Sequence, residues 1–435
     1  MNICILGGGM SAISLAYFLQ KNSSISSIHI YEKDKKLGGL CRSFNCKGIY
    51  YDVGPHIIFS KHKEILKLML KLLQNNKNSI KRSNQILLNG NYIKYPFENN
   101  LSSLKNRKLI DQCLISFKNN PYENIVAKNM LQFFLKTFGE GITNIYLRPY
   151  NEKIWKYDPS CMDTQMVDRI PKPPLEDIIR SAEGNNSEGY LHQLFFHYPK
   201  EGGIESLVKS FINHLNKKKI FINTDYEIKS LSKKQNYFIV NKDNDIKFDK
   251  IISTIPLEKL GNIYNKTPKK ILKISSNLRF NSIITCLVNI KGIIAKDHFA
   301  MMVPDKSIIF HRLSRLDFLG KNYSIKGTTT FLVEVTYREG SYISALSDKM
   351  LFNKICSGLK KIKYIKDRKD INFYELKKFS HAYVIYDLDH RKNVDDLIKY
   401  YKKQNIIVNG RFGSYEYLNS DQIIKQSLDL SKELF

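Results

Sequence analysis

The sequence contains no apolar run that approaches the roughly 18 residues needed to cross a bilayer, so we expect no transmembrane helix. Its seven cysteines are scattered, odd in number and free of any CxxC pair, so they indicate neither a disulfide framework nor a zinc site or another metal centre. Met1 leads directly into a strand-like segment, which leaves no room for the charged and apolar regions of a signal peptide. We therefore expect a cytoplasmic, reduced protein.

Acidic residues are also few: 41 Asp and Glu stand against 69 Lys and Arg, a net charge of +28 over 435 residues. Such a field would attract nucleic acid, anionic lipid or a phosphate-bearing substrate. The excess is mostly lysine spread along the whole chain, and no nucleic-acid recognition motif accompanies it, so we expect no nucleic-acid partner. Aromatic residues make up 12% of the chain, enough for a large folded core. The charge would assist an anionic small substrate.

The periodicity of apolar residues divides the chain into a recurring α/β pattern without an internal repeat or an evident linker. It favours a Rossmann-like domain assembled from segments 1–75, 201–260 and 396–435, with a mainly helical insertion and substrate segment at 76–200 and a β-rich substrate domain with an antiparallel sheet at 261–395. The predicted elements are strands at 2–6, 27–31, 220–223, 250–255 and 406–409, helices at 10–21, 63–73, 204–215 and 421–433, a hairpin at 237–248, and β-rich runs between 282 and 335.

A glycine turn joins the first predicted strand to the first helix. It reads Gly7-x-Gly9-x-x-Ala12, in which the first glycine allows a tight turn, the second lets a pyrophosphate approach the backbone, and the small alanine allows close packing. The amides at the start of the helix would face the phosphates. Glu32 ends the next strand, where a carboxylate can accept hydrogen bonds from a ribose. This context predicts a dinucleotide-binding domain, whereas the glycines alone could mark a simple tight turn.

A second glycine pair narrows the choice of cofactor. The segment 37–43 reads Leu-Gly-Gly-Leu-Cys-Arg-Ser and follows Glu32 and Lys33, and it suits FAD, which needs backbone contacts beyond the pyrophosphate. It resembles the glutathione-reductase-like FAD superfamily, in particular its amine-oxidase-like branch. An ordinary loop with a solvated Arg42 is the alternative.

A finer resemblance is to the UDP-galactopyranose mutase family. Its most specific part is Gly410-Arg411-Phe412-Gly413-Ser414-Tyr415-Glu416-Tyr417-Leu418-Asn419-Ser420-Asp421-Gln422, which is similar to the mutase signature GRLG-x-Y-x-Y-x-DMDQ. The other matching segments are Gly54–Phe59 (GPHIIF), Tyr95–Phe97 (YPF), Tyr150–Trp155 (YNEKIW), Arg169–Pro171 (RIP) and Ile252–Pro256 (ISTIP).

This resemblance implies a non-covalent FAD enzyme that acts on a nucleotide-linked sugar for surface polysaccharide synthesis, with N5 of the reduced flavin attacking the anomeric carbon. The flavin would need an electron donor, either NAD(P)H or a reductase, and the chain could form an oligomer. The implied catalytic residues are His56, Arg312, Tyr383, Tyr417 and Asn419. The implied substrate-binding residues are Trp155, Arg169, Lys172, Arg312, Tyr383 and Tyr417. The implied cofactor-binding residues are Gly7, Gly9, Met10, Ser11, Ala12, Glu32, Lys33, Gly39, Leu40, Arg42, Gly54, His56, Gly410, Arg411, Asn419 and Ser420.

Each of these side chains also has a structural interpretation. Arg312 could be a surface residue of a strand, His56 a loop histidine, and Trp155, the only tryptophan, an anchor of the helical insertion. Tyr383 and Tyr417 are two of 26 tyrosines and could belong to the core.

The chain departs from the mutase pattern at three places. Asn419 stands where the pattern has aspartate, Lys172 and Pro173 replace a second arginine, and residues 198–203 (YPKEGG) resemble protoporphyrinogen-oxidase-like relatives more than mutases. A lysine can supply charge but not a bidentate fork. An amine-oxidase-type or protoporphyrinogen-oxidase-type oxidoreductase is therefore the alternative function, and a basic binding protein with a vestigial flavin site is a third.

Overall fold

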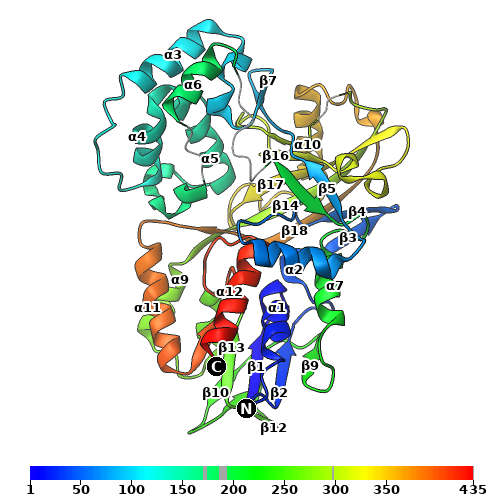
Figure 1. Cartoon of the computed structure of the whole chain (residues 1–435), viewed down its shortest axis with the longest axis vertical. Coiled ribbons are helices and arrows are strands. Elements are labelled where there is room, and N and C mark those ends of the chain that lie inside the picture. The colour runs from blue at the N-terminus through cyan, green and yellow to red at the C-terminus, as the bar shows by residue number, and fades with distance from the viewer. Residues whose placement is uncertain (170–173, 186–193, 296–297, 435) are drawn as a thin grey trace.

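The computed structural model describes residues 1–169, 174–185, 194–295 and 298–434, apart from the side chains of residues 168, 169, 175 and 244. Two bodies make up the molecule (Figure 1). One contains a parallel sheet and both chain termini, and the other contains an antiparallel sheet flanked by a group of helices. The chain passes between the two bodies several times, so that each body is assembled from separate segments.

A five-stranded parallel sheet, in the order β19-β13-β1-β2-β9, forms the centre of the first body. The strands β1 and β13 are buried on both faces, which explains their apolar runs. The confirmed fold class is thus α/β with a Rossmann-like domain. The strands are β1 (Asn2–Leu6), β2 (Ser27–Tyr31), β9 (Ile220–Asn223), β13 (Lys250–Ser253) and β19 (Ile406–Val408).

Seven helices cover this sheet and its edges. The first and last of them, α1 and α12, pack directly against each other, although almost the whole chain separates them (Figure 1). The helices are α1 (Met10–Leu19), α2 (Lys63–Leu73), α7 (Glu205–Asn213), α8 (Leu257–Ile263), α9 (Lys269–Ser276), α11 (His390–Lys403) and α12 (Ser420–Glu433). A small antiparallel sheet of β10 (Leu231–Lys233), β11 (Phe238–Val240) and β12 (Asp243–Phe248) lies beside β1.

A seven-stranded sheet, in the order β18-β14-β17-β16-β15-β6-β7, dominates the second body. The helix α10 (Asp348–Lys361) covers one of its faces through a shared apolar cluster. The strands are β6 (Asn84–Leu88), β7 (Asn91–Lys94), β14 (Arg279–Lys291), β15 (Ala300–Met302), β16 (Arg312–Arg315), β17 (Thr328–Tyr337) and β18 (Ile371–Ile385).

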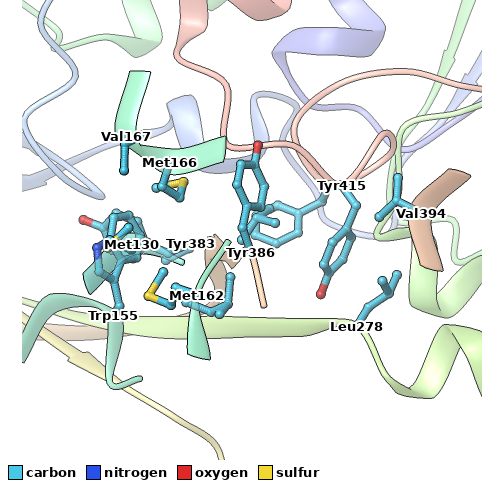
Figure 2. Close-up of a cluster of buried hydrophobic side chains, with 14 of the residues drawn as sticks. Met130, Trp155, Met162, Met166, Val167, Leu278, Tyr383, Tyr386, Val394 and Tyr415 are labelled. Carbon is cyan, nitrogen blue, oxygen red and sulfur yellow. The ribbon is translucent and has the colours of Figure 1, made fainter. Parts of the chain in front are cut away.

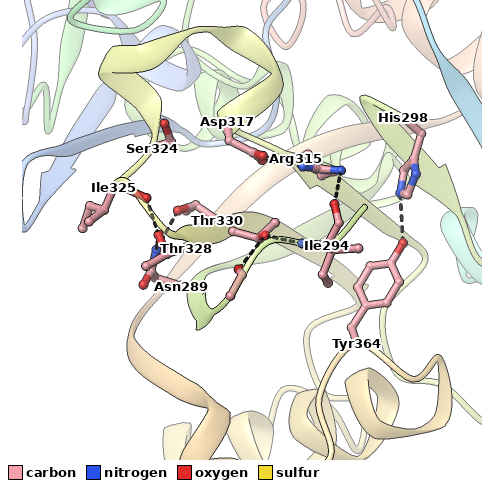
Figure 3. A network of polar contacts seen from close by, with 12 residues as sticks. Asn289, Ile294, His298, Arg315, Asp317, Ser324, Ile325, Thr328, Thr330 and Tyr364 are labelled. Atoms are coloured by element: carbon pink, nitrogen blue, oxygen red, sulfur yellow. Dashed lines mark hydrogen bonds and ion pairs between the residues drawn. The ribbon is translucent and has the colours of Figure 1, made fainter. Parts of the chain in front are cut away.

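Buried polar groups within this sheet bond to each other (Figure 3). Asn289 donates to the hydroxyls of Thr328 and Thr330, both at 2.8 Å, and Arg315 donates to the carbonyl of Ile294 at 3.1 Å. Because a buried polar group without a partner costs free energy, these contacts favour one arrangement of the sheet and its loops.

The remaining helices form a group on the other side of the second body (Figure 1). They are α3 (Arg107–Lys118), α4 (Met130–Ile142), α5 (Arg148–Trp155) and α6 (Leu175–Ala182). Away from these helices, two short antiparallel strand pairs pack against the seven-stranded sheet: β3 (Ser43–Cys46) with β4 (Ile49–Asp52), and β5 (Asn78–Lys81) with β8 (Phe195–Tyr198).

A buried cluster joins this helical group to the sheets (Figure 2). Met130, Met162 and Met166 pack there around Trp155 and Tyr383. Trp155, predicted as a possible anchor of the insertion, is indeed buried, with 6% of its surface exposed.

Several predicted elements agree with the structure, and others do not. The helix at 63–73 buries one face through Ile65, Met69 and Leu72, as its spacing indicates. The segment 76–200 is only partly helical, because β6 and β7 leave it to join the seven-stranded sheet. The predicted boundary at 395 falls inside α11, which packs against β19. Among the described residues, no helix is both long and apolar enough to cross a membrane.

Candidate active site

The glycine turn after β1 leaves bare backbone beside the N-terminus of α1. Gly7 has a φ of +91°, which favours glycine. A Cβ atom built on Gly9 would meet no other atom within 4 Å, so this backbone faces open space. A Cβ atom on Gly39 would lie 3.2 Å from the Cα of Gly9, so the two glycine segments approach each other closely. The pattern predicted that a pyrophosphate approaches the backbone at Gly9, and the open space there leaves room for one.

Glu32 and Arg42 hold the two glycine segments. The carboxylate of Glu32 accepts hydrogen bonds from the amides of Gly8 at 2.7 Å and Asp34 at 2.9 Å. Arg42 donates to the carbonyl of Gly39 at 2.9 Å and pairs with Asp34 at 2.8 Å. Arg42 is therefore not the freely solvated side chain of the alternative interpretation. Its contacts with Gly39 and Asp34 hold the second glycine pair in place.

The C-terminal turn closes on the same helix N-terminus. Gly410 has a φ of +89°, and a Cβ atom there would lie 2.4 Å from the hydroxyl of Ser11. The side-chain amide of Asn409 donates a hydrogen bond to that hydroxyl at 2.8 Å. Met10, Ser11 and Ala12 have buried side chains, so only their backbone amides could serve a ligand. Segments 400 residues apart in the sequence thus form one turn-lined site.

Arg312 lies at the end of this site that faces the second body. Its guanidinium forms a two-pronged ion pair with the carboxylate of Glu334, with contacts of 2.5 and 2.7 Å. The Glu334 side chain is fully buried, whereas 29% of the Arg312 side chain is exposed. A Cβ atom on Gly54 would lie 3.2 Å from Glu334, which places the predicted Gly54 turn beside the pair. Arg312 is therefore a half-buried, oriented cation.

His56 shares this environment with two arginines. Burial and, to a smaller extent, the positive charges of Arg411 and Arg312 lower its pKa to about 4. The imidazole is consequently neutral at pH 7. It can donate or accept a hydrogen bond without adding a third positive charge.

Arg411 lies between two aromatic rings. Its guanidinium carbon is 4.1 Å from the ring centre of Tyr417 and 5.7 Å from that of Tyr383. It also donates to the carbonyls of Ala382 at 2.6 Å and Leu418 at 3.2 Å. Its buried Nε has no partner among the described residues. This nitrogen is a donor for which a ligand acceptor would be favourable.

Trp155 completes the aromatic group. Its ring meets Tyr383 and Tyr417 edge-on, with centroid distances of 5.7 and 5.5 Å. The structure thus brings together four of the predicted side chains, Trp155, Tyr383, Arg411 and Tyr417, from three distant segments. Burial raises the pKa of Tyr383, so its hydroxyl stays protonated and can donate a hydrogen bond.

Tyr150 and Lys153 were not predicted as site residues, although both lie in the YNEKIW segment. Burial raises the pKa of Tyr150, while the nearby charge of Arg312 opposes this shift. The ammonium of Lys153 donates to the carbonyls of Val303 and Asp305, both at 2.7 Å, and burial lowers its pKa to about 7. The spacing of the segment is the signal that could have identified them, since Tyr150, Lys153 and Trp155 fall within two helical turns.

The remaining predicted residues divide into three groups. Asn419 precedes α12 and receives a capping contact, its amide donating to Gln422 at 2.9 Å, and Ser420 begins that helix. Lys33 is exposed, and Leu40 is half-buried. Lys172 lies outside the described residues, as does the side chain of Arg169. Of the described residues, no group of three or more His, Cys, Asp or Glu could hold a metal.

The fold and the glycine turns are those of a nucleotide-binding Rossmann-like domain. In agreement, a family model described as an NAD(P)-binding Rossmann-like domain matches residues 5–72. Among solved structures, reduced UDP-galactopyranose mutase superposes with a TM-score of 0.90 at 22% identity and covers 100% of this chain and 93% of that one. An engineered putrescine oxidase superposes with a TM-score of 0.65 at 11% identity, covering 100% and 98%.

One curated relative is the protoporphyrinogen oxidase of Dictyostelium discoideum, which is 22% identical over 377 residues and covers 69% of this chain and 70% of that protein. At these identities the structural likenesses show the fold. They confirm the predicted resemblance to mutase-like and oxidase-like flavoenzymes at that level, and the predicted FAD cofactor agrees with them.

Proposed function

We propose that this chain is a FAD-dependent enzyme that acts on a nucleotide-linked sugar, in a reaction of the UDP-galactopyranose mutase type that serves surface polysaccharide synthesis. The grouping of Arg312 and Arg411 with Trp155, Tyr383 and Tyr417 beside the glycine turns is the observation that carries this proposal. A nucleoside diphosphate needs cations for its phosphates and donors at its oxygens, and this grouping offers both.

The residues around the glycine turns fit FAD. Gly9 and Gly39 offer bare backbone, and the first amides of α1 point toward the space beside them. The two carboxylate oxygens of Glu32 have about four lone-pair sites, of which the amides of Gly8 and Asp34 use one each, so ribose hydroxyls can still be accepted. When bound and reduced, FAD would supply a nucleophilic nitrogen for an anomeric carbon.

On the substrate side, the protein would have to bind the anionic leaving group, the nucleoside diphosphate. Arg312 would neutralise the pyrophosphate while Glu334 keeps its guanidinium in one orientation. The hydroxyls of Tyr383 and Tyr417 would donate to phosphate oxygens. A neutral His56 would keep the sugar side free of a further positive charge that would oppose the one developing at an anomeric carbon.

The experiment is an anaerobic titration of the dithionite-reduced protein with UDP, followed through the flavin absorbance. We expect saturable binding, and the variant Arg312→Lys should bind UDP several-fold more weakly because lysine keeps the charge but loses the fork. Arg315→Lys is the matched control, since Arg315 lies on the same strand and pairs with Asp317 rather than with the site. Equal weakening in both variants, or no binding by the wild type, would contradict the proposal.

The alternative is an amine-oxidase-type or protoporphyrinogen-oxidase-type oxidoreductase. The likeness to the Dictyostelium enzyme and the YPKEGG segment favour it. This function predicts that the flavin is reduced by an amine or porphyrinogen substrate and that UDP leaves the flavin absorbance unchanged.

A further inference from the structure

We propose that His381 is a positioning residue for the nucleotide end of the site: its contact with Glu258 fixes a bulge in β18 that sets Tyr383 and Arg411. This inference rests on the proposed function, because it assigns these two side chains to UDP. His381 itself would touch neither substrate nor cofactor.

The bulge is visible in the pairing of β14 with β18. Asn281 pairs with Tyr383 and Ile283 pairs with Phe379, so β14 advances by two residues where β18 advances by four. His381 lies inside this bulge with a φ of +55°, a backbone conformation that few residues other than glycine adopt. Bulges of this kind redirect the side chains that follow them. The residue redirected here is Tyr383, two positions on.

Three neighbours hold the imidazole of His381 in place. Its Nε2 lies 2.6 Å from the carboxylate of Glu258 on α8, and its ring stacks on Phe280 with a centroid distance of 3.9 Å. The ring of Phe412 meets it edge-on at 5.4 Å. Only 12% of the His381 side chain and 14% of the Glu258 side chain are exposed, so water screens the contact weakly. A strand of the second body is thus tied to a helix of the first.

Both ends of this contact lead to Arg411. The carbonyl of Ala382, directly after His381, accepts the hydrogen bond from the Arg411 guanidinium at 2.6 Å. Phe412, directly after Arg411, contacts the His381 ring, and its carbonyl accepts from the amide of Leu257 at the start of α8. If the bulge relaxes, Tyr383 and the acceptor of Arg411 move together. The Glu258 contact is the polar one of the three contacts that resist this movement.

Trp155 provides a readout that needs no flavin. It is the only tryptophan of the chain, and it packs edge-on against Tyr383. A shift of Tyr383 changes the surroundings of this indole, so the fluorescence of the apo protein reports the bulge directly. UDP affinity of the reduced holoprotein is the second readout.

The test compares His381→Ala with His381→Gln. The side-chain amide of glutamine reaches as far as the Nε2 of histidine and can donate to Glu258, so this variant should behave like the wild type. We expect His381→Ala to shift the Trp155 emission and to weaken UDP binding about tenfold, since small displacements of binding groups are costly. Asn241→Ala is the control, because Asn241 also has a positive φ of 51° and bonds its own loop, through Lys229 and Ser230, away from the site. This control should leave both readouts unchanged.

Unchanged Trp155 emission and UDP affinity in His381→Ala would overturn the proposal, as would a failure of His381→Gln to restore them. Should His381→Ala not fold, Glu258→Gln keeps the size of the partner and its hydrogen-bonding oxygen but removes its negative charge. Wild-type readouts in that variant would also overturn the proposal, whereas the same changes in weaker form would support it. If wild-type protein binds no UDP, the proposed function fails, but the emission of the apo variants still decides whether His381 positions Tyr383.

Discussion

The two ends of the candidate site are built in different ways. The cofactor end is formed by backbone: glycines at 7, 39 and 410 let neighbouring segments approach closely, and Gly9 leaves open space beside the start of α1. The nucleotide end is formed by side chains, in which Arg312, Arg411 and three aromatic rings from separate elements contact one another or share partners. A site formed by backbone depends on the absence of side chains at a few glycine positions. A site formed by side chains depends on the many contacts that position each group.

Gly410→Ala should produce the largest loss. The new Cβ atom would lie 2.4 Å from the Ser11 hydroxyl, and the φ of +89° is unfavourable for alanine. We expect the free energy of unfolding to fall by about 3 kcal/mol or more, together with loss of flavin. Urea denaturation measures the change. Gly340→Ala, with a φ of +78° but open space around its Cβ, is the control and should lose about 1–2 kcal/mol. Equal losses would show that the Ser11 contact is unimportant.

Asp52→Asn addresses the connection between the two bodies. Asp52 accepts hydrogen bonds from Ser43, Tyr198 and the amide of Ile204, and burial raises its pKa from 3.8 to about 6. Since the native protein then keeps this proton to a higher pH than the unfolded chain, the free energy of unfolding falls as pH rises from about 4 to about 6, by up to about 3 kcal/mol.

The asparagine variant has no carboxyl group to protonate at this position, so its free energy of unfolding should vary less with pH over the same interval. Urea midpoints at several pH values between 4 and 7 measure the two slopes. Identical slopes would mean that Asp52 titrates normally.

Gly9→Ala separates binding from folding at the cofactor end. Gly9 has a φ of −73° and open space around its Cβ, so alanine should change the free energy of unfolding by no more than about 1 kcal/mol. The added methyl would occupy the space intended for the pyrophosphate, and we expect flavin affinity to fall about tenfold or more. The flavin-to-protein ratio after gel filtration measures it. Full retention of flavin would place the cofactor elsewhere.

Asn419→Asp should have the smallest effect. Aspartate caps a helix as well as asparagine does, so the melting temperature should hardly move. A new carboxylate near the phosphates should weaken UDP binding about two- to fivefold, equivalent to roughly 0.5–1 kcal/mol. The anaerobic UDP titration measures it. Tighter binding would show that residue 419 contacts a donor rather than a phosphate.

The same contrast explains what the sequence could predict. The glycine turn, α1, β2 and the helix at 63–73 follow from local spacing, because a tight turn and an amphipathic face depend on neighbouring residues. The long strand β18, the helices α10 and α11 and the place of β6 and β7 in a distant sheet were not predicted. Charged residues interrupt the apolar pattern of β18, so its sequence gives only a weak strand signal. Its partner β14 lies some 90 residues earlier, so no local signal reveals the pairing.

Resemblance, rather than pattern, identified most of the nucleotide end. The motifs pointed to Arg312, Tyr383, Arg411 and Tyr417, and the structure brings them together through contacts that no local pattern shows. Tyr150, Lys153 and His381 were missed because their roles depend on what faces them: Arg312 for Tyr150, two loop carbonyls for Lys153, and Glu258 for His381.

The packing of α12 against α1 has a consequence for synthesis of the protein. The ribosome delivers the turn at Gly410 long after β1 and the first glycine turn, yet Asn409 and Gly410 close directly on Ser11. A nascent chain therefore cannot complete the cofactor end until the segment around Gly410 has left the ribosome. Capture of the flavin would have to wait for that segment, and a chain that terminates before it should emerge colourless.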